Sequence, residues 1–203
     1  EKIFNALNQI KISIDQHKDE IEKLDQEIGD GDHIFNIQRG IKESLDLKDE
    51  LSGQAPNEVL KKIGMKIMTT VGGASGALFS TLIMGMSKKY NGELSDQKNI
   101  AEMFTDGVEA MKKRGKADLG EKTMLDVLIP VSKELQKLSD QENVKHIAEK
   151  IKEVAEKGML STKNLIATKG RASFLGERAK GHIDPGARSS QLAIEAICNI
   201  IIN

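Results

Sequence analysis

The sequence predicts an all-α protein that folds as a single domain over residues 1–203. Apolar residues recur at spacings of three and four along most of the chain, which is the period of an amphipathic helix. The alternation with period two that is typical of strands is nearly absent, and aromatic residues make up only 3%. A chain of 203 residues can bury a sizeable core, and no linker or internal repeat divides it.

We expect about eight helices. The first apolar stripe runs from Ile3 to Ile28 and predicts one long helix. Pro56 marks the start of the third stripe, because proline is favoured in the first turn of a helix. The later stripes span residues 34–45, 59–67, 78–86, 100–111, 125–135, 144–165 and 192–200.

Composition excludes several classes of function. The net charge of −1 provides no basic field for nucleic acid and no polybasic anchor for a membrane surface. No apolar run is long enough to span a bilayer. The single Cys198 cannot form an internal disulfide and lies on an apolar helical stripe, so we expect a buried thiol in a reduced, cytoplasmic protein.

The glycines are clustered in four segments. Residues 29–36, 71–76, 115–124 and 170–186 hold 11 of the 18 glycines, and each segment falls at a break between helical stripes. Glycine is ordinary at the ends of helices, but each of these segments also carries Asp, Ser, His, Lys or Arg. Loops that offer backbone amides and charged groups at one rim of a helical bundle favour an anionic ligand.

The first segment reads GDGDH at residues 29–33, and Asp25 precedes it. Asp30 and Asp32 face the same point if the loop is extended, while Asp25 approaches from the end of the preceding helix. Carboxylates without cysteine favour Mg²⁺, Mn²⁺ or Ca²⁺. An EF-hand is excluded because Phe35 stands where its glycine is required. The alternative is that these residues only cap helices.

The next two segments suggest phosphate contacts. VGGASG at 71–76 brings backbone amides and the Ser75 hydroxyl to a helix start, although such glycines also permit close helix packing. RGKADLGEKT at 114–123 nearly matches the P-loop pattern, but Glu121 interrupts it and a helix precedes it, which excludes a P-loop fold. Met124 follows, where its thioether suits either the core or a purine face.

The last segment is GRASFLGERAKGHIDPGARSS, residues 170–190. Asp184 and Pro185 are expected as the N-cap and first residue of the last helix, with the amides of Gly186 and Ala187 available to an anion. Arg171 and Arg178 could bind a phosphate, although surface arginines are usually solvated. In the first segment, the His33 side chain is a further candidate for hydrogen bonding to phosphate.

Together these segments indicate a composite site for Mg²⁺ and a nucleotide. In chain order, DQEIGDGDH, VGGASG, RGKADLGEKTMLD and GRASFLGERAKGHIDPGA closely resemble the L-subunit family of bacterial dihydroxyacetone kinase, over essentially the whole chain. The resemblance implies an up-and-down barrel of eight amphipathic antiparallel helices with the nucleotide at one rim. It also implies that bound ADP is rephosphorylated in place by a phosphohistidine of subunit M, and that the ATP formed phosphorylates dihydroxyacetone held on subunit K.

By position, the resemblance assigns Asp25, Asp30 and Asp32 to Mg²⁺, with two ions expected. Ile34 is a departure, because the family usually has glycine there. No residue need be a covalent nucleophile, since phosphoryl transfer depends on positioning and charge neutralisation. The residues assigned to ADP are His33, Ile34, Phe35, Asn36, Ala74, Ser75, Gly115, Met124, Arg171, Asp184, Pro185 and Gly186.

Two other functions remain open at this point. The same fold serves as an ATP-exchanging domain in ATP-dependent dihydroxyacetone kinases and fatty acid kinases. A nucleotide-loaded module that binds a transcriptional regulator without catalysis would need the same metal ligands.

Overall fold

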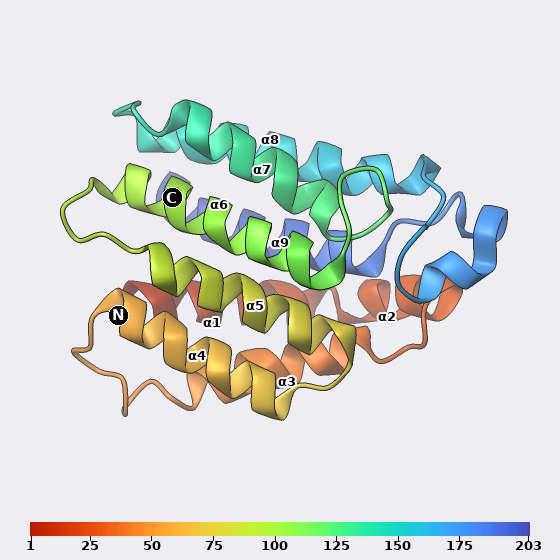
Figure 1. The fold of residues 1–203 in the computed structure, drawn as a ribbon, viewed down its shortest axis with the longest axis horizontal. Helices are drawn as coiled ribbons and strands as arrows, with labels where there is room; N and C mark the ends of the chain where they lie inside the picture. The colour runs from red at the N-terminus through yellow and green to blue at the C-terminus, as the bar shows by residue number, and fades with distance from the viewer.

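The computed structural model describes residues 1–203 and contains only helices, so the all-α prediction is confirmed (Figure 1). Nine α-helices and two short 3₁₀ segments follow one another along the chain. Their bounds are α1 Lys2–Gln16, α2 Lys18–Ile28, α3 His33–Leu45, α4 Pro56–Thr70, α5 Gly73–Lys89, α6 Asp96–Gly115, α7 Leu125–Leu138, α8 Val144–Ser161, η1 Thr162–Asn164, η2 Arg171–Ala179 and α9 Pro185–Ile202.

The helices close into an up-and-down barrel. Each helix from α3 to α9 packs against the next one, and α1 packs against both α9 and α3, which completes the ring. Connections alternate between the two ends of the barrel (Figure 1). The four glycine-rich segments lie together at the right-hand end in that view, and both chain termini lie toward the left. The predicted grouping of these segments at one rim is therefore confirmed.

The first predicted helix is divided in the structure. The stripe from Ile3 to Ile28 is continuous in sequence, but the chain leaves helical geometry at His17, where φ is −109° and ψ is 17°. The His17 ring contacts the Ser13 carbonyl through Nδ1 at 2.8 Å, a local side-chain bond that competes with the helical ladder. As a result α2 is a separate short helix that leads into the rim.

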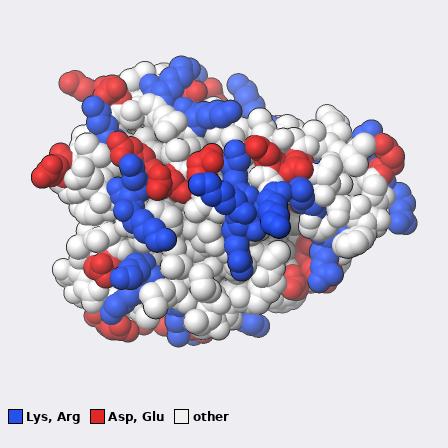
Figure 2. All heavy atoms as spheres, viewed as in Figure 1, with Lys and Arg blue, Asp and Glu red and all other residues white.

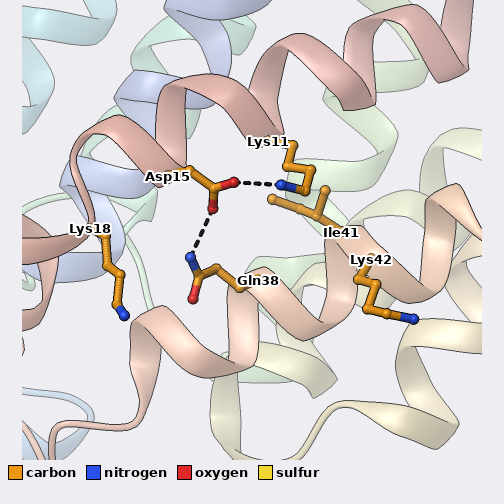
Figure 3. Close-up of a pocket in the computed structure, with 6 residues that line it drawn as sticks. All are labelled: Lys11, Asp15, Lys18, Gln38, Ile41 and Lys42. Atoms are coloured by element: carbon orange, nitrogen blue, oxygen red, sulfur yellow. Dashed lines mark hydrogen bonds and ion pairs between the residues drawn. The ribbon is translucent and has the colours of Figure 1, made fainter.

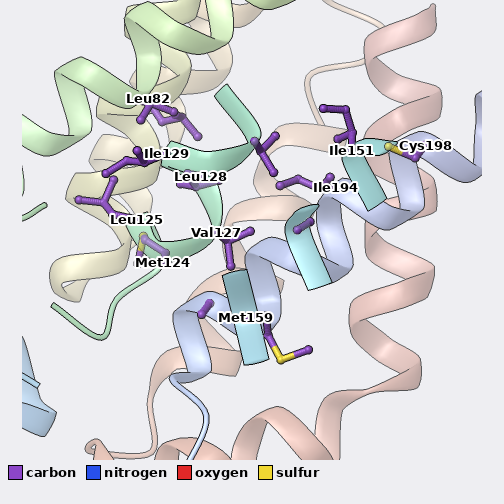
Figure 4. Packing of buried hydrophobic residues seen from close by; sticks show 14 of the residues in the cluster. Leu82, Met124, Leu125, Val127, Leu128, Ile129, Ile151, Met159, Ile194 and Cys198 are labelled. Atoms are coloured by element: carbon purple, nitrogen blue, oxygen red, sulfur yellow. The ribbon is translucent and has the colours of Figure 1, made fainter. Parts of the chain in front are cut away.

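The largest part of the core lies between α7 and its neighbours (Figure 4). Val127 and Val131 of α7 are fully buried, and α8 and α9 pack around them with Ile151 and Ile194. Cys198 belongs to this cluster, and burial raises the pKa of its thiol to about 12, as expected for a core cysteine. The rim ends of α7 and α9 are therefore held by a rigid core.

Gly158 allows α8 to approach α7 closely. A methyl group added there would lie 2.4 Å from the Asp126 carbonyl oxygen and 3.0 Å from the Val127 Cα. We expect Gly158→Ala to lower the free energy of unfolding by about 1–3 kcal/mol, because backbone atoms must move to admit it. Urea denaturation measures the loss. Gly92→Ala, in a loop where a Cβ meets only the Tyr90 ring at 3.7 Å or more, is the control, and equal midpoints for the two variants would contradict the prediction.

The outer surface is mostly a mixture of both charges (Figure 2). Lys and Arg side chains gather over the rim end of α6, whose last turn contains Lys112, Lys113 and Arg114. A shallow groove between α1 and α3 contains three lysines, and Figure 3 shows Lys11 paired with Asp15, at 2.5 Å. Lys42 pairs with Asp46 at 2.6 Å. This groove is a solvated face outside the rim, in which two of the three lysines are paired with aspartates. No helix is long and apolar enough to cross a membrane.

Candidate functional site

Three carboxylates converge at the rim. Asp25 from α2 and Asp30 and Asp32 from the loop beyond it each offer an oxygen within 4.8 Å of the others. Asp25 is buried and accepts the His33 N–H at 2.9 Å through Oδ2. Asp32 stands at the N-cap position of α3, yet its side chain accepts no capping hydrogen bond. Capping therefore explains one oxygen of Asp25 and leaves the Asp32 carboxylate without a structural role.

The glycines of this loop make the convergence possible. A Cβ on Gly29 would lie 1.9 Å from Asp25 Oδ1, so any side chain there would displace that carboxylate. Gly31 has a φ of +78°, a conformation that other residues rarely adopt. The spacing GDGD thus turns the chain sharply enough to aim Asp30 and Asp32 back toward Asp25.

This set of oxygens fits a hard divalent cation. Carboxylates grouped this closely repel one another unless a positive charge lies among them. Arg171 supplies one such charge, since its Nε lies 2.8 Å from Asp30 Oδ2, but both side chains are substantially exposed. Asp25 and Asp32 have no cationic side chain in contact. The donor chemistry and the spacing match Mg²⁺ better than a softer metal.

The VGGASG loop lies directly against the carboxylates. Gly73, with φ of +71°, begins α5 within the motif, and a Cβ there would lie 3.3 Å from Asn36 Nδ2 and 3.5 Å from Asp32 Oδ2. Gly76 is buried, and a Cβ on it would lie 2.3 Å from the Val71 carbonyl oxygen. No side chain caps α5, so its first amides, at Ala74 and Ser75, have no acceptor within the protein at the end of the helix that lies beside Asp32.

The His33 ring connects three helices at the rim. Its Nδ1 lies 3.0 Å from Ser75 Oγ and its Nε2 lies 2.9 Å from Ser189 Oγ. Ser189 donates to the Gly186 carbonyl, so it accepts from Nε2, and Nδ1 of a neutral ring then accepts the Ser75 proton. Burial lowers the pKa of His33 against the opposing effect of Asp25 and Asp32, which keeps the ring neutral. The expected contact of this ring with phosphate stays a prediction, because both nitrogens are already engaged.

At the start of α3, backbone N–H groups face the rim, whereas the side chains point elsewhere. Ile34 is fully buried among Ile14, Ile21 and Leu192, so its side chain points into the barrel. Its N–H and that of Phe35 have no acceptor within the protein. The departure from glycine at Ile34 therefore leaves the amide available, while Phe35 is about half exposed under the Lys18 ammonium, 5.6 Å from its ring centroid.

Ile34 should consequently matter for stability and not for ligand retention. We expect Ile34→Val to lower the free energy of unfolding by about 0.5–1.5 kcal/mol through the lost methyl group. Native mass spectrometry should find the same bound nucleotide and metal as in the wild type. Ile12→Val, whose side chain is exposed, provides the control. A folded Ile34→Val protein that has lost its ligands would contradict this assignment.

Gly115 and Met124 lie at the two ends of the loop between α6 and α7. A Cβ on Gly115 would lie 3.2 Å from Leu78 Cδ2 of α5, so this glycine lets the loop leave α6 close to α5. Met124 is largely buried and immediately precedes α7. Its Cε lies 3.0 Å from a Cβ built on Gly186, so a side chain at that position would push against Met124.

Asp184 and Pro185 begin α9 as predicted, but the expected anion site beyond them is only partly present. The Asp184 carboxylate accepts the Ala187 N–H at 2.7 Å, so the Ala187 amide is not free for a ligand. Burial raises the pKa of Asp184 to about 7, and the neighbouring Asp126 and Asp25 add to that rise while Lys122 opposes it. The sequence identified the cap correctly and missed that the cap consumes the amide.

Sequence reasoning also missed how these loops are attached. Asp126, buried in the first turn of α7, accepts the Gly120 N–H at 2.6 Å and the Thr123 N–H at 2.8 Å. Glu121 accepts the Asp118 N–H and the Thr168 hydroxyl at 2.6 and 2.8 Å, which joins this loop to the segment before η2. The sequence signal for this attachment was the GEKTMLD stretch, in which charged residues surround the start of a helix.

Comparison with known proteins places this chain in a family. The model of the DAK2 domain matches residues 27–199. The chain is 41% identical to the "PEP-dependent dihydroxyacetone kinase 1, ADP-binding subunit DhaL" of Listeria innocua, covering 94% of this chain and 91% of that one. It is 38% identical to the ADP-binding subunit DhaL of the Escherichia coli kinase, covering 86% and 84%. The chain belongs to the DAK2 family.

Within the DAK2 family, the relatives that match this chain over most of both lengths are named as ADP-binding subunits DhaL of dihydroxyacetone kinases. The sequence motifs predicted this relationship. Solved structures agree on the fold. The native dihydroxyacetone kinase of C. freundii superposes with a TM-score of 0.76 at 22% identity, and its complex with AMP-PNP and Mg²⁺ with 0.75 at 23%. This DAK2 chain spans about a third of the length of those solved kinases.

Proposed function

We propose that this chain is the ADP-binding subunit of a phosphoenolpyruvate-dependent dihydroxyacetone kinase. The observation that carries the proposal is the set of Asp25, Asp30 and Asp32 oxygens within 4.8 Å of one another, placed against the uncapped start of α5. Identity of 41% over 94% of the chain to a protein named as such a subunit supports the assignment.

The three carboxylates would hold Mg²⁺, and we propose two ions, since three carboxylates and a diphosphate offer enough oxygens for both. When bound, the metal would supply positive charge to the phosphate oxygens. The free amides at Ile34, Phe35, Ala74 and Ser75 would donate to phosphate oxygens and orient them. Asn36 is buried beside Gly73, where its amide can support the same loop.

Arg171 and Met124 would complete the nucleotide site. Arg171 lies at the edge of the carboxylate cluster on an exposed segment, so its guanidinium can turn from Asp30 to a phosphate without disturbing the core. Gly115, Met124 and the Asp184–Pro185–Gly186 turn lie on the other loops of the rim and would receive the nucleoside. In this arrangement the protein positions and neutralises the phosphates, and no side chain acts as a covalent nucleophile.

Subunits K and M of such a kinase are the proposed partners, with M as phosphoryl donor to bound ADP and K as the carrier of dihydroxyacetone. Apolar side chains exposed on the rim loops support docking of protein surfaces there: Phe174 is 83% exposed and Leu119 50%. A cytoplasmic location fits the single free cysteine.

Transfer distinguishes this function from its alternatives. The chain, carrying ADP, is mixed with the phosphorylated M subunit of a related kinase, and nucleotides are then quantified after denaturation. ATP formed on the chain in one turnover is the expected result. Rapid exchange with free ATP and turnover without M would indicate an ATP-dependent kinase instead. Bound nucleotide with no transfer in either direction would indicate a regulatory module.

A further inference from the structure

Lys122 is the most unusual charged residue of the chain. It is 1% exposed, although lysine is almost never fully buried unless it is paired. Its backbone has a φ of +60°, and the only other residue except glycine with a positive φ is Lys116, in the same loop. The sequence places Lys122 where a near P-loop pattern would put a phosphate-binding lysine, but the side chain points inward instead.

The ammonium group binds two carbonyl oxygens from distant parts of the chain. Nζ donates to the Thr162 carbonyl at 2.5 Å and to the His182 carbonyl at 2.5 Å. Burial lowers the pKa of Lys122, and the nearby carboxylates of Asp184 and Asp126 oppose that effect. The Thr162 carbonyl also accepts the Leu165 N–H at 3.3 Å, whereas the Lys122 ammonium is the hydrogen-bond donor found for the His182 carbonyl.

Thr162 completes the attachment from the other side. It is fully buried at the end of α8, and its hydroxyl accepts the Asp184 N–H at 3.1 Å. The Lys122 ammonium and the Thr162 hydroxyl therefore fix two points of the chain just before α9, at His182 and Asp184. Asp184 then caps α9, and Gly186 rests against Met124.

We propose that Lys122 is a positioning residue for the nucleoside half of the nucleotide site. It joins the loop that carries Met124 to the turn that carries Asp184 and Gly186, without contacting the ligand itself. The carboxylate half has supports of its own, in the bond from the His33 N–H to Asp25 and in the packing of Gly73 on Asn36. It also contacts the other half, from His182 Nδ1 to Glu27 Oε2 at 2.7 Å and from His33 Nε2 to Ser189 Oγ at 2.9 Å, and neither contact uses the Lys122 ammonium. This inference rests on the nucleotide-binding function proposed above. It assigns Lys122 a role in binding the nucleoside of the nucleotide and none in binding its phosphates.

If Lys122 positions only the nucleoside half of the site, its replacement should weaken the binding of ADP and leave the binding of pyrophosphate nearly unchanged. In Lys122→Met, which keeps the length of the side chain and removes the ammonium, we expect the dissociation constant of ADP to rise about ten-fold or more, because the His182 carbonyl loses its donor and the turn shifts. The affinity for pyrophosphate with Mg²⁺ should stay within about two-fold of the wild type. Titration calorimetry of the full-length protein, stripped of ligand, measures both.

Two further variants secure the result. Lys116→Met alters the exposed lysine of the same loop and should change neither affinity. Thr162→Val removes the hydroxyl that accepts from the Asp184 N–H and donates to the Met159 carbonyl, and it leaves no buried charge unpaired. It should therefore weaken ADP binding about three-fold even if Lys122→Met does not fold. Equal losses of affinity for ADP and pyrophosphate in Lys122→Met would overturn the inference, as would unchanged ADP binding in Thr162→Val.

The wild-type protein separates failure of the proposed function from failure of this inference. If the wild type binds no ADP, both are refuted. If the wild type binds ADP and the variants bind it equally well, this inference alone is refuted.

Discussion

Replacing Asp32 with asparagine should abolish Mg²⁺-dependent retention of ADP while leaving the helical fold intact. Asp32 is suited to this test because its carboxylate caps no helix and contacts no cationic side chain. Loss of a side chain that hydrogen-bonds to a metal ligand typically weakens metal binding by about 10–100-fold, so loss of a ligand itself should weaken it by at least about 100-fold. Native mass spectrometry reports both metal and nucleotide, and far-ultraviolet circular dichroism reports the fold.

Asp25→Asn would be a less decisive variant. Asp25 is buried and also accepts the first N–H of α3, so its replacement mixes a structural effect with the loss of a ligand. Asp19→Asn, an exposed change in the first turn of α2, is the matched control for charge. If Asp32→Asn still retains ADP and Mg²⁺ at wild-type levels through gel filtration, the metal assignment is wrong.

The fold could be predicted from sequence because the sequence patterns that specify it are local. A period near 3.6 and the scarcity of strand patterns determine the helices, and glycine-rich breaks determine the loops that meet at the rim. The break at His17 could not be predicted, because the apolar stripe continues through it. What interrupts the helix is a ring contact with a backbone carbonyl, which leaves no mark on the periodicity.

The site was predictable to the extent that it lies on contiguous motifs. The Asp25, Asp30 and Asp32 convergence follows from spacing and from two glycines. The attachment of the rim loops does not, since Lys122 binds carbonyls 40 and 60 positions away in sequence. A lysine in a glycine-containing loop suggests a ligand contact, and only the three-dimensional packing shows that its ammonium is directed into the protein.

Asp184 connects the chemistry of the rim to stability. Its carboxylate is needed as an acceptor to begin α9, but its surroundings disfavour the charge: burial raises its pKa to about 7, with Asp126 and Asp25 nearby. An asparagine could accept the same hydrogen bond from the Ala187 N–H without carrying a charge. The wild-type residue therefore retains a charge at a cost in stability of the ligand-free protein, as is common where a group serves a ligand.

Asp184→Asn should accordingly make the ligand-free protein more stable at pH 8. The folded carboxyl group binds its proton up to about pH 7, whereas the unfolded one releases it near 3.8, so wild-type stability falls as pH rises through that window. A shift of this size corresponds to on the order of 4 kcal/mol. The variant lacks this titration, so the two free energies of unfolding should agree near pH 4 and separate by pH 8. Urea denaturation across this range measures both, with the exposed Asp140→Asn as control. Parallel curves for wild type and variant would show that the folded Asp184 ionises at an ordinary pKa, and the carboxylate would then cap α9 without any penalty from its burial.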